Sequence, residues 1–379
     1  MKNLFTQLQS RLCSVYESPP QGNELKRINN LSGFIAGMIR KDSCHMADIG
    51  SGLPQQIDAY SREVAAKRFV DNKWVDCEAY FLPFLDRFLR ALLAFLPPWS
   101  EIRLVMDGSQ TGKDHATLMV CLAWRGRGIP LCWFTKKGAK GHFTEKDHIA
   151  LFERARHLLQ PLLPEGKPVT LLGDGEFDGI GLQQSCLACG WDYVLRTACD
   201  TILHGDGERF QPRAVAPEPG EDCLFIPGLE FTAARFRYVN FVCWHDRRKF
   251  KDPIYLVSNL DEAGDIIERY DERFSIECLF KDLKSTSFNL HKTRLKTAFA
   301  ISNLIMIAAL ALIMLLCLGL EFEHSPLRKK VQRLRKDRPV LSIFAFACRL
   351  VAYLLEHDLA FSFSFQFSKN SGFSLQRDG

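Results

Sequence analysis

The chain has 379 residues, of which 47% are hydrophobic and 25% are charged, and this ordinary globular composition excludes wholesale disorder and a small disulfide scaffold. The 49 Lys and Arg against 44 Asp and Glu give a net charge of +5, which excludes a uniformly basic nucleic-acid-binding coat. Thirteen scattered cysteines and a start that lacks a long apolar core predict free, mostly buried thiols in a reducing cytoplasm.

Short helices are predicted between residues 24 and 96, where apolar residues recur at a spacing of roughly 3.6. Breaks at residues 50–52 and at Pro54 separate these helices. Short helices joined by tight turns suit a helix-turn-helix DNA reader, so residues 1–98 are predicted to be a helical DNA-binding domain. A plain helical packing domain is the alternative.

The next part of the chain alternates between strands and helices. The predicted order is a strand at 102–106, strands at 115–124 and 129–134, a helix at 145–159, a strand at 169–172, a helix at 178–189 and a strand at 191–196. Three strands followed by alternating helices and strands describe a mixed sheet with helices on its faces. This order fits the ribonuclease H fold, and residues 99–196 are predicted to be the first part of that core.

Residues 197–260 are strand-like, with Gly, Pro and acidic turns, and they predict an all-β insertion. A helical region follows from about residue 263. We assign 261–320 to the end of the core and 321–379 to a basic C-terminal helical region and tail. The fold class is therefore α+β, a ribonuclease H-like mixed-sheet core with an all-β insertion, an N-terminal helical domain and C-terminal helices. The tail is expected to be an edge strand or a disordered end, with alternating Phe361, Phe363, Phe365 and Phe367.

Residues 298–320 contain no charged side chain and fall within the length of a membrane span, about 17 to 25 residues. Basic residues flank this segment on both sides, so no charge asymmetry orients it in a bilayer. A helix buried on all sides in a large core has the same composition. We favour the buried helix and expect no membrane association, with a single membrane span as the alternative.

Two carboxylates come directly after predicted buried strands, Asp107 and Asp174. On adjacent strands, such groups could share divalent cations, and oxygen-rich sites suit Mg²⁺ or Mn²⁺. The alternative is that each Asp-Gly pair is only a turn. Asp114 competes weakly with Asp107, and Glu176 and Asp178 compete with Asp174, but the position at a strand end favours Asp174.

A third carboxylate lies in residues 269–284, which we expect to form one helix. At about 100° per residue, Tyr270, Arg273, Glu277 and Lys284 occupy one narrow stripe beside an apolar stripe that can pack on the sheet. Glu277 could complete a metal site, Arg273 and Lys284 could pair with phosphates, and Tyr270 could bond to or stack on a DNA strand. The alternative is a solvated face on which Arg273 and Glu277 form an ordinary ion pair.

The spacing Y-x2-R-x3-E-x6-K, together with the two preceding Asp residues, resembles the DDE transposases of bacterial insertion sequences, in the group named for its Tyr-Arg-Glu-Lys signature. The resemblance covers roughly residues 24–320 and implies a ribonuclease H-like core with a β-rich insertion before the catalytic Glu. It implies that catalysis and metal binding belong to Asp107, Asp174 and Glu277. It also implies that DNA is contacted by Tyr270, Arg273 and Lys284.

The resemblance further implies Mg²⁺-dependent cleavage at transposon ends, with Mn²⁺ able to substitute, followed by strand transfer into target DNA. The expected partner is double-stranded DNA, and a homodimer would hold two ends together at the bacterial nucleoid. One alternative is a ribonuclease H-like nuclease that cuts without joining. The other is a non-catalytic DNA-binding regulator that uses the N-terminal helices.

The charge is unevenly distributed along the chain. Residues 324–338 carry seven Lys and Arg against one acidic residue, and residues 281–296 carry five against one. The predicted insertion offsets part of this positive charge, because residues 205–230 hold two Arg against six acidic residues. The modest net charge is therefore compatible with DNA binding at local basic segments.

Overall fold

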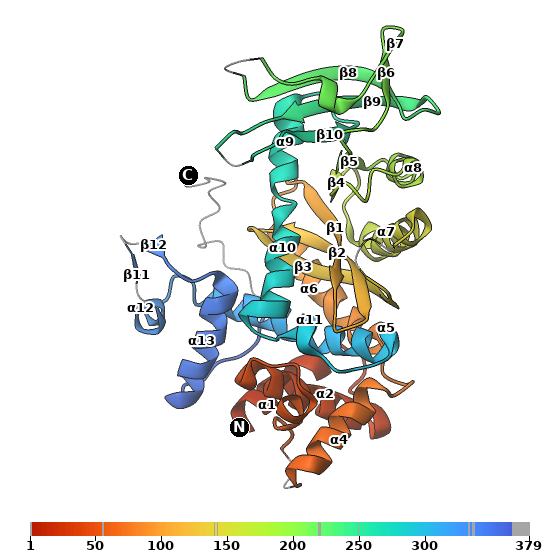
Figure 1. The fold of residues 1–379 in the computed structure, drawn as a ribbon. Coiled ribbons are helices and arrows are strands. Elements are labelled where there is room, and N and C mark those ends of the chain that lie inside the picture. The colour runs from red at the N-terminus through yellow and green to blue at the C-terminus, as the bar shows by residue number, and fades with distance from the viewer. Residues whose placement is uncertain are drawn as a thin grey trace.

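A computed structural model of the chain describes residues 2–365, except 55–56, 140, 142, 219–220, 249, 333 and 336–337. In this described part, ten strands form one mixed sheet in the order β3-β2-β1-β4-β5-β10-β9-β8-β6-β7 (Figure 1). Strands β1, β2 and β3 are antiparallel, whereas β1 pairs with β4 and β4 pairs with β5 in parallel. This α+β arrangement is consistent with a ribonuclease H-like fold.

The core elements match the predicted ones closely. They are β1 (Ile102–Gln110), β2 (His115–Trp124), β3 (Arg127–Lys137), α7 (Glu145–Leu159), β4 (Val169–Gly173), α8 (Ile180–Ala188) and β5 (Asp192–Arg196), with a 3₁₀ turn at Gln160–Leu162. Helix α7 begins at a capping box in which Thr144 and Asp147 satisfy each other's backbone N–H groups, and this fixes the start of the helix.

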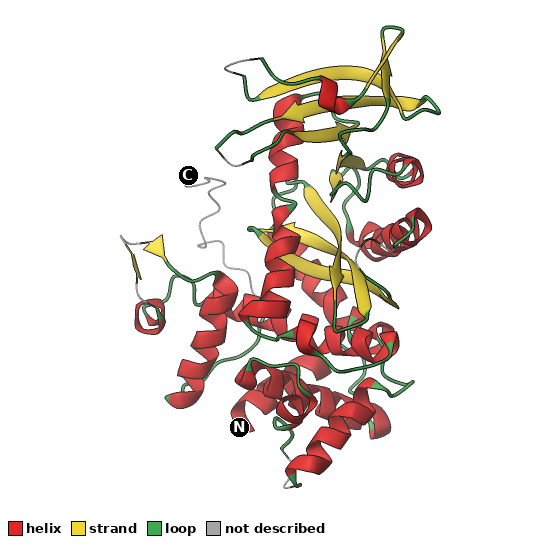
Figure 2. Ribbon diagram, viewed as in Figure 1, coloured by secondary structure: helices red, strands yellow, loops and turns green. Residues whose placement is uncertain are grey.

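The N-terminal region is helical, as predicted (Figure 2). Its helices are α1 (Lys2–Cys13), α2 (Gly22–Lys41), α3 (Met46–Gly50), α4 (Ala59–Val70), α5 (Cys77–Tyr80) and α6 (Leu82–Phe95). Helix α1 lies before the first predicted helix and was not expected. Glycines let α2 approach the α3 region closely, because a Cβ atom on Gly37 would lie 2.1 Å from the Ile49 carbonyl oxygen. Asn303 fastens this region to the rest of the chain by donating to the carbonyls of Val70 and Val75.

The strands predicted between residues 197 and 260 are present. They are β6 (Leu203–Gly205), β7 (Glu208–Phe210), β8 (Cys223–Phe231), β9 (Phe236–Trp244) and β10 (Ile254–Ser258), with a 3₁₀ turn at Pro212–Ala214. They extend the core sheet, because β10 pairs antiparallel with β5. Figure 1 shows β8 and β9 at the end of the molecule farthest from the N-terminal helices. Whether this region is a separate domain stays a prediction.

The C-terminal part is mostly helical. It contains α9 (Ala263–Asp271), α10 (Phe274–Lys281), a π-helix at Asp282–Thr286, a 3₁₀ turn at Leu290–Lys292, α11 (Ala298–Glu321), α12 (Leu327–Val331) and α13 (Ile343–Glu356). Two short strands, β11 (Leu334–Arg335) and β12 (Arg338–Pro339), interrupt it.

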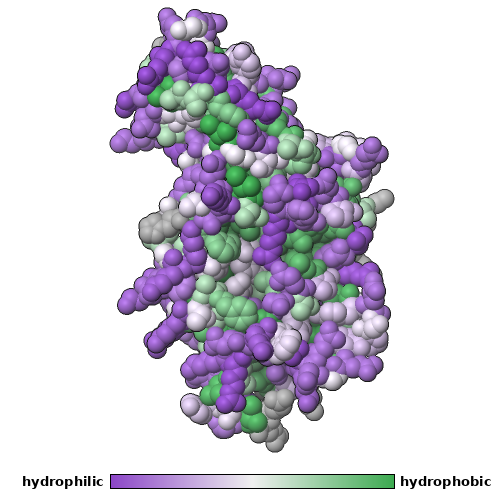
Figure 3. All heavy atoms as spheres, turned by 90° about the vertical axis from the view of Figure 1, so that its right-hand side faces the viewer, coloured by the Kyte–Doolittle hydropathy of each residue, from purple (hydrophilic) through white to green (hydrophobic). Residues whose placement is uncertain are grey.

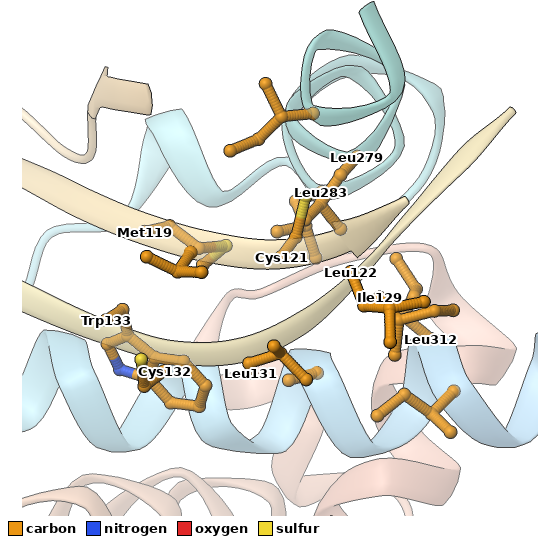
Figure 4. Packing of buried hydrophobic residues seen from close by; sticks show 14 of the residues in the cluster. Met119, Cys121, Leu122, Ile129, Leu131, Cys132, Trp133, Leu279, Leu283 and Leu312 are labelled. Atoms are coloured by element: carbon orange, nitrogen blue, oxygen red, sulfur yellow. The ribbon is translucent and has the colours of Figure 1, made fainter. Parts of the chain in front are cut away.

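Helix α11 is the apolar segment that raised the membrane alternative. It is long and apolar enough to cross a bilayer, but 94% of its most apolar window is buried within the chain. Figure 4 shows the reason: β2 and β3 lie between α10 and α11, with Leu279 of α10 on one side and Leu312 of α11 on the other. Trp133 of β3 also donates through its indole Nε1 to the Ser302 hydroxyl of α11 at 2.9 Å. Packing inside the molecule thus accounts for the apolar composition of this helix.

The described part of the tail, residues 361–365, forms no strand. Phe361 and Phe363 are buried, and Phe365 packs edge-on against Phe84 and Phe88 of α6. Phe367 lies outside the described residues. The expectation of an edge strand is therefore wrong for residues 361–365, where side-chain packing on α6 replaces strand pairing.

The face toward α7 and α8 is drawn in Figure 3. Hydrophilic residues cover most of this face, and hydrophobic residues show in small areas between them. Scattered apolar surface of this kind is normal for a folded protein and marks no docking site.

Candidate active site

Asp107 and Asp174 lie at corresponding positions on two neighbouring parallel strands. Met106 of β1 is opposite Gly173 of β4, and each Asp is the next residue along its strand. The expectation that the first strand ends at Asp107 is wrong, because β1 continues to Gln110. Hairpin pairing with β2 extends it, whereas its pairing with β4 stops at Met106. The β4 side of β1 is therefore open from Asp107 onward.

The two carboxylates differ in their surroundings. Asp107 is only 4% exposed and accepts a hydrogen bond from the backbone N–H of Gly108 at 2.7 Å. Asp174 is half-buried and accepts one from the backbone N–H of Glu176 at 3.1 Å. Asp174 also lines an open cavity of about 610 Å³, which Arg196 at the end of β5 lines as well. One carboxylate is thus held within the sheet, and the other faces solvent-accessible space.

The signature residues do not lie on one continuous helix, as we had expected. Helix α9 ends at Asp271, α10 begins at Phe274, and Arg273 lies in the turn between them. At this point the chain forms 3₁₀-type hydrogen bonds, in which an N–H donates to the carbonyl three residues earlier. One of them runs from Arg273 N–H to the Tyr270 carbonyl at 2.9 Å. The break carries no Gly or Pro, so the sequence gives no signal for it. Tyr270 therefore belongs to α9 and Glu277 to α10.

Arg273 joins two of the three carboxylates. Its guanidinium lies 2.5 Å from Glu277 Oε1 and 4.0 Å from Asp107 Oδ2. The side chain is buried, and burial lowers its pKa, but Tyr270, Glu277 and Asp107 outweigh burial and raise the pKa of Arg273 above its ordinary value. The ion pair of Arg273 and Glu277, which the alternative expected, is thus formed, but Arg273 is buried and also lies near the Asp107 carboxylate.

The remaining signature residues lie on either side of this group. Tyr270 is only 1% exposed, and its ring centre is 5.7 Å from the Arg273 guanidinium carbon. The ring therefore packs against Arg273 on its buried side. Lys284 lies in the π-helix and donates to the Ser109 hydroxyl at 2.5 Å, two residues beyond Asp107 on β1. Contact of these residues with DNA stays a prediction. Ser109 was not expected here, and the extension of β1 past Asp107 is what brings it into reach.

Of the three competing carboxylates, Glu176 lines the same cavity as Asp174, whereas Asp178 and Asp114 do not line it. Asp178 accepts a hydrogen bond from the Thr197 hydroxyl at 2.6 Å, and burial raises the pKa of Asp178 above its ordinary value. Asp114 is exposed in the loop between β1 and β2. Neither residue shares the register that places Asp174 beside Asp107.

The carboxylate set has the chemistry of a divalent cation site, because hard oxygen ligands are those that Mg²⁺ prefers. Among the described residues, no three His, Cys, Asp or Glu side chains gather closely enough to hold a metal ion. Arg273 supplies the positive charge between Asp107 and Glu277. The ligand types therefore fit a cation, and Glu277, whose side chain is 51% exposed, has room to move toward one.

The transposase DDE domain model matches residues 104–314 of the chain, a stretch that begins in β1 and ends in α11 and so contains all the residues described above. The chain belongs to the DDE transposase family. Its general function is therefore DNA transposition and recombination, carried out by an enzyme that acts on DNA. Members of this family generally use divalent metal ions.

Other comparisons add little to this assignment. A crystal structure of Ciona intestinalis endonuclease V, in complex with a 23mer DNA containing an inosine followed by a ribo-adenosine, is 14% identical to this transposase. The match covers 56% of this chain and 86% of that chain, with a TM-score of 0.28. No curated protein matches the chain.

Proposed function

We propose that this transposase belongs to the Tyr-Arg-Glu-Lys group of bacterial insertion sequences, cleaves DNA at transposon ends and joins the freed 3′-hydroxyl to target DNA. The observation that carries the proposal is the register of β1 and β4, which sets Asp107 beside Asp174, with Glu277 tied to Asp107 through Arg273. Mg²⁺ is the proposed cofactor, and Mn²⁺ can substitute for it.

Asp107, Asp174 and Glu277 are the residues that would hold the cations. When bound, divalent cations supply positive charge to the phosphodiester and lower the pKa of the attacking water. Glu277 would hold a cation only when its ion pair with Arg273 opens, and the Arg273 guanidinium would then be available to a phosphate. Tyr270 holds Arg273 in place, and Lys284 binds a neighbouring phosphate.

Cleavage and joining are both phosphoryl transfers, in which first water and then the 3′-hydroxyl of the cleaved strand attacks phosphorus. No covalent enzyme intermediate is needed, so the site requires positioning and charge and no nucleophilic side chain. This requirement agrees with a candidate site made of carboxylates, one Arg, one Lys and one buried Tyr.

The proposal extends to the assembly and its setting. Two transposon ends must be held together for joining, so the active form is a homodimer on DNA in the bacterial cytoplasm, at the nucleoid. The helices within residues 1–98 bind end DNA. A monomer that joins ends at full rate would contradict this part of the proposal.

The test is an assay of cleavage and joining with a duplex that carries the end of the element, a supercoiled plasmid target and Mg²⁺. Asp107→Asn, Asp174→Asn and Glu277→Gln should each abolish both products, whereas Asp178→Asn, the matched control, should retain them. Cleavage without joining would show a nuclease. DNA binding that survives removal of residues 101–379, with no cleavage by the full chain, would show a regulator.

A further inference from the structure

A second open cavity, of about 500 Å³, lies between the N-terminal helices and the segment that leads into α11. We call it the α4 groove. One wall holds His45, at the start of α3, with Glu63 and Lys67 of α4, and the other holds Thr293 and Arg294. Glu63 is already paired with Lys67 at 2.5 Å. The remaining charge that lines the groove is therefore positive.

The segment beside the α4 groove presents three cations to solvent. Lys292, Arg294 and Lys296 are all exposed, whereas Thr293 between them is buried and Leu295 is half-buried. This alternation is that of an extended chain, in which successive side chains point to opposite sides. We call these three cations the basic strip. Lys292 ends the 3₁₀ turn before this extended stretch, so the shared side, away from the core, is that of Arg294 and Lys296.

The basic strip is not engaged by carboxylates of the protein. In the described part of the chain, none of its three members forms an ion pair. Cations on the core behave differently: Arg103 pairs with Glu101 and Arg127 pairs with Asp282. Three exposed, unpaired cations in a row next to an open groove provide charge for an external anion.

The strip is also held in place. The backbone just before it is tied to α2, because Asn289 donates to the Asp42 carbonyl at 3.0 Å and Cys44 donates to the Asn289 carbonyl at 3.2 Å. Within the strip, Thr293 packs against the loop after β1, since a Cβ atom on Gly112 would lie 3.0 Å from its methyl carbon. An anion that binds here therefore meets a preformed surface, which lowers the entropic cost of binding.

The loop after β1 also limits the distance between the strip segment and Asp107. Gly112 is five residues beyond Asp107, and five extended residues span at most about 18 Å. One strand of B-DNA advances 3.4 Å along the axis per phosphate, so Gly112, which contacts the strip segment at Thr293, lies within about five base pairs of Asp107.

We propose that the basic strip, with His45 across the α4 groove, is a binding site for the backbone phosphates of duplex DNA beside the cleaved bond. The inference rests on the proposed function, because it takes the carboxylates as the point of cleavage. It adds a site outside the signature residues at which the N-terminal helices and the core bind the same stretch of backbone.

The test measures DNA affinity as a function of salt, by fluorescence anisotropy with a labelled duplex of mixed sequence in EDTA. Replacing Lys292, Arg294 and Lys296 together by Gln should lower the slope of log Kd against log salt by about 2.7, because each phosphate contact contributes about 0.9. The charge-preserving triple variant, with Arg, Lys and Arg at these positions, should keep the wild-type slope.

The matched control replaces three exposed cations of the β6–β9 region by Gln, at Arg209, Arg213 and Arg237, none of which lies in a segment assigned to DNA binding. Its slope should equal that of the wild type. Equal slopes for the strip variant and the control, with wild-type protein binding DNA, would overturn the inference and leave the proposed function standing. Absence of DNA binding by the wild type would overturn both.

A footprint tests the position of the contact. Hydroxyl-radical protection of the phosphates beside the cleaved bond should be reduced in the Gln strip variant and remain in the control. Protection that persists undiminished in the strip variant, or that was never present there in the wild type, would overturn the placement.

Discussion

Arg273 is the residue on which the candidate site depends most. It is 8% exposed and lies within ion-pair distance of both Asp107 and Glu277. Its guanidinium therefore supplies the positive charge that a bound metal ion would otherwise supply to these carboxylates. Removing a buried partner leaves an uncompensated charge, which costs several kcal/mol. A divalent cation bound by the same carboxylates would replace the lost charge.

This reasoning predicts how the Arg273→Gln variant responds to metal. Without metal its Tm should lie below that of the wild type, and Mg²⁺ should raise the Tm of the variant more than that of the wild type. Differential scanning fluorimetry with and without Mg²⁺ measures both shifts, with Arg273→Lys as the charge-preserving control. Equal Mg²⁺ shifts in Arg273→Gln and wild type would show that Arg273 and the metal do not share these carboxylates.

Asp282 gives a prediction about pH. Burial raises its pKa to about 6, against the attraction of Arg127, whose guanidinium lies 3.0 Å away. Because this pKa is higher in the folded than in the unfolded chain, the folded state binds more protons between the two values. The contribution of Asp282 to stability therefore falls as pH rises from about 4 to about 6, by at most about 3 kcal/mol.

The measurement is urea unfolding of the wild type and of Asp282→Asn across this pH range. The wild type should lose stability relative to the variant as pH rises, because Asn cannot titrate. Parallel pH profiles for the two proteins would contradict the prediction.

At the scale of the elements, the sequence predicts most segments and misses the departures from regular geometry. Strand β2 and helix α7 begin and end at the residues predicted for them. The turn at Arg273 and the π-helix at Asp282–Thr286 carry no Gly or Pro, so a uniform 100° per residue was assumed. The sequence therefore predicts one continuous helix for the four signature residues, and the structure has two helices there. The residues nevertheless lie near β1.

The contacts of the site were predictable only in part. Asp107 and Asp174 could be paired from strand ends, because parallel strands bring their carboxyl ends to one edge of a sheet. The contact of Lys284 with Ser109 could not, since it needs both the π-helix and the extension of β1. The burial of Tyr270 depends on how α9 packs on the sheet, which composition does not determine.

The close approach of α2 and α3 gives an element-scale prediction. A methyl group on Gly37 would lie 2.1 Å from the Ile49 carbonyl oxygen, so Gly37→Ala should destabilise the chain by about 1–3 kcal/mol through overpacking. Gly264→Ala on α9 is the control, because its methyl group would meet no atom within 4 Å. Urea unfolding measures both variants, and equal stabilities would contradict the packing described here.

At the scale of the whole molecule, the net charge of +5 conceals its distribution. The N-terminal helices and the segment before α11 line the α4 groove, and the loop after β1 contacts that segment at Thr293. The strands from β6 to β9 continue the same sheet beyond β10. One sheet therefore carries Asp107 and Asp174, with the N-terminal helices at the end of the molecule opposite β8 and β9 (Figure 1).

The central claim is that Asp107, Asp174 and Glu277 act as one metal-holding unit. The measurement is the rate constant of Mg²⁺-dependent strand cleavage for the three single variants, Asp107→Asn, Asp174→Asn and Glu277→Gln, and for the triple variant. Because residues that act as a unit are not additive, each single variant should lose at least about 10²-fold and fall close to the triple variant. A single variant that cleaves at the wild-type rate, or losses that multiply toward the triple variant, would contradict it.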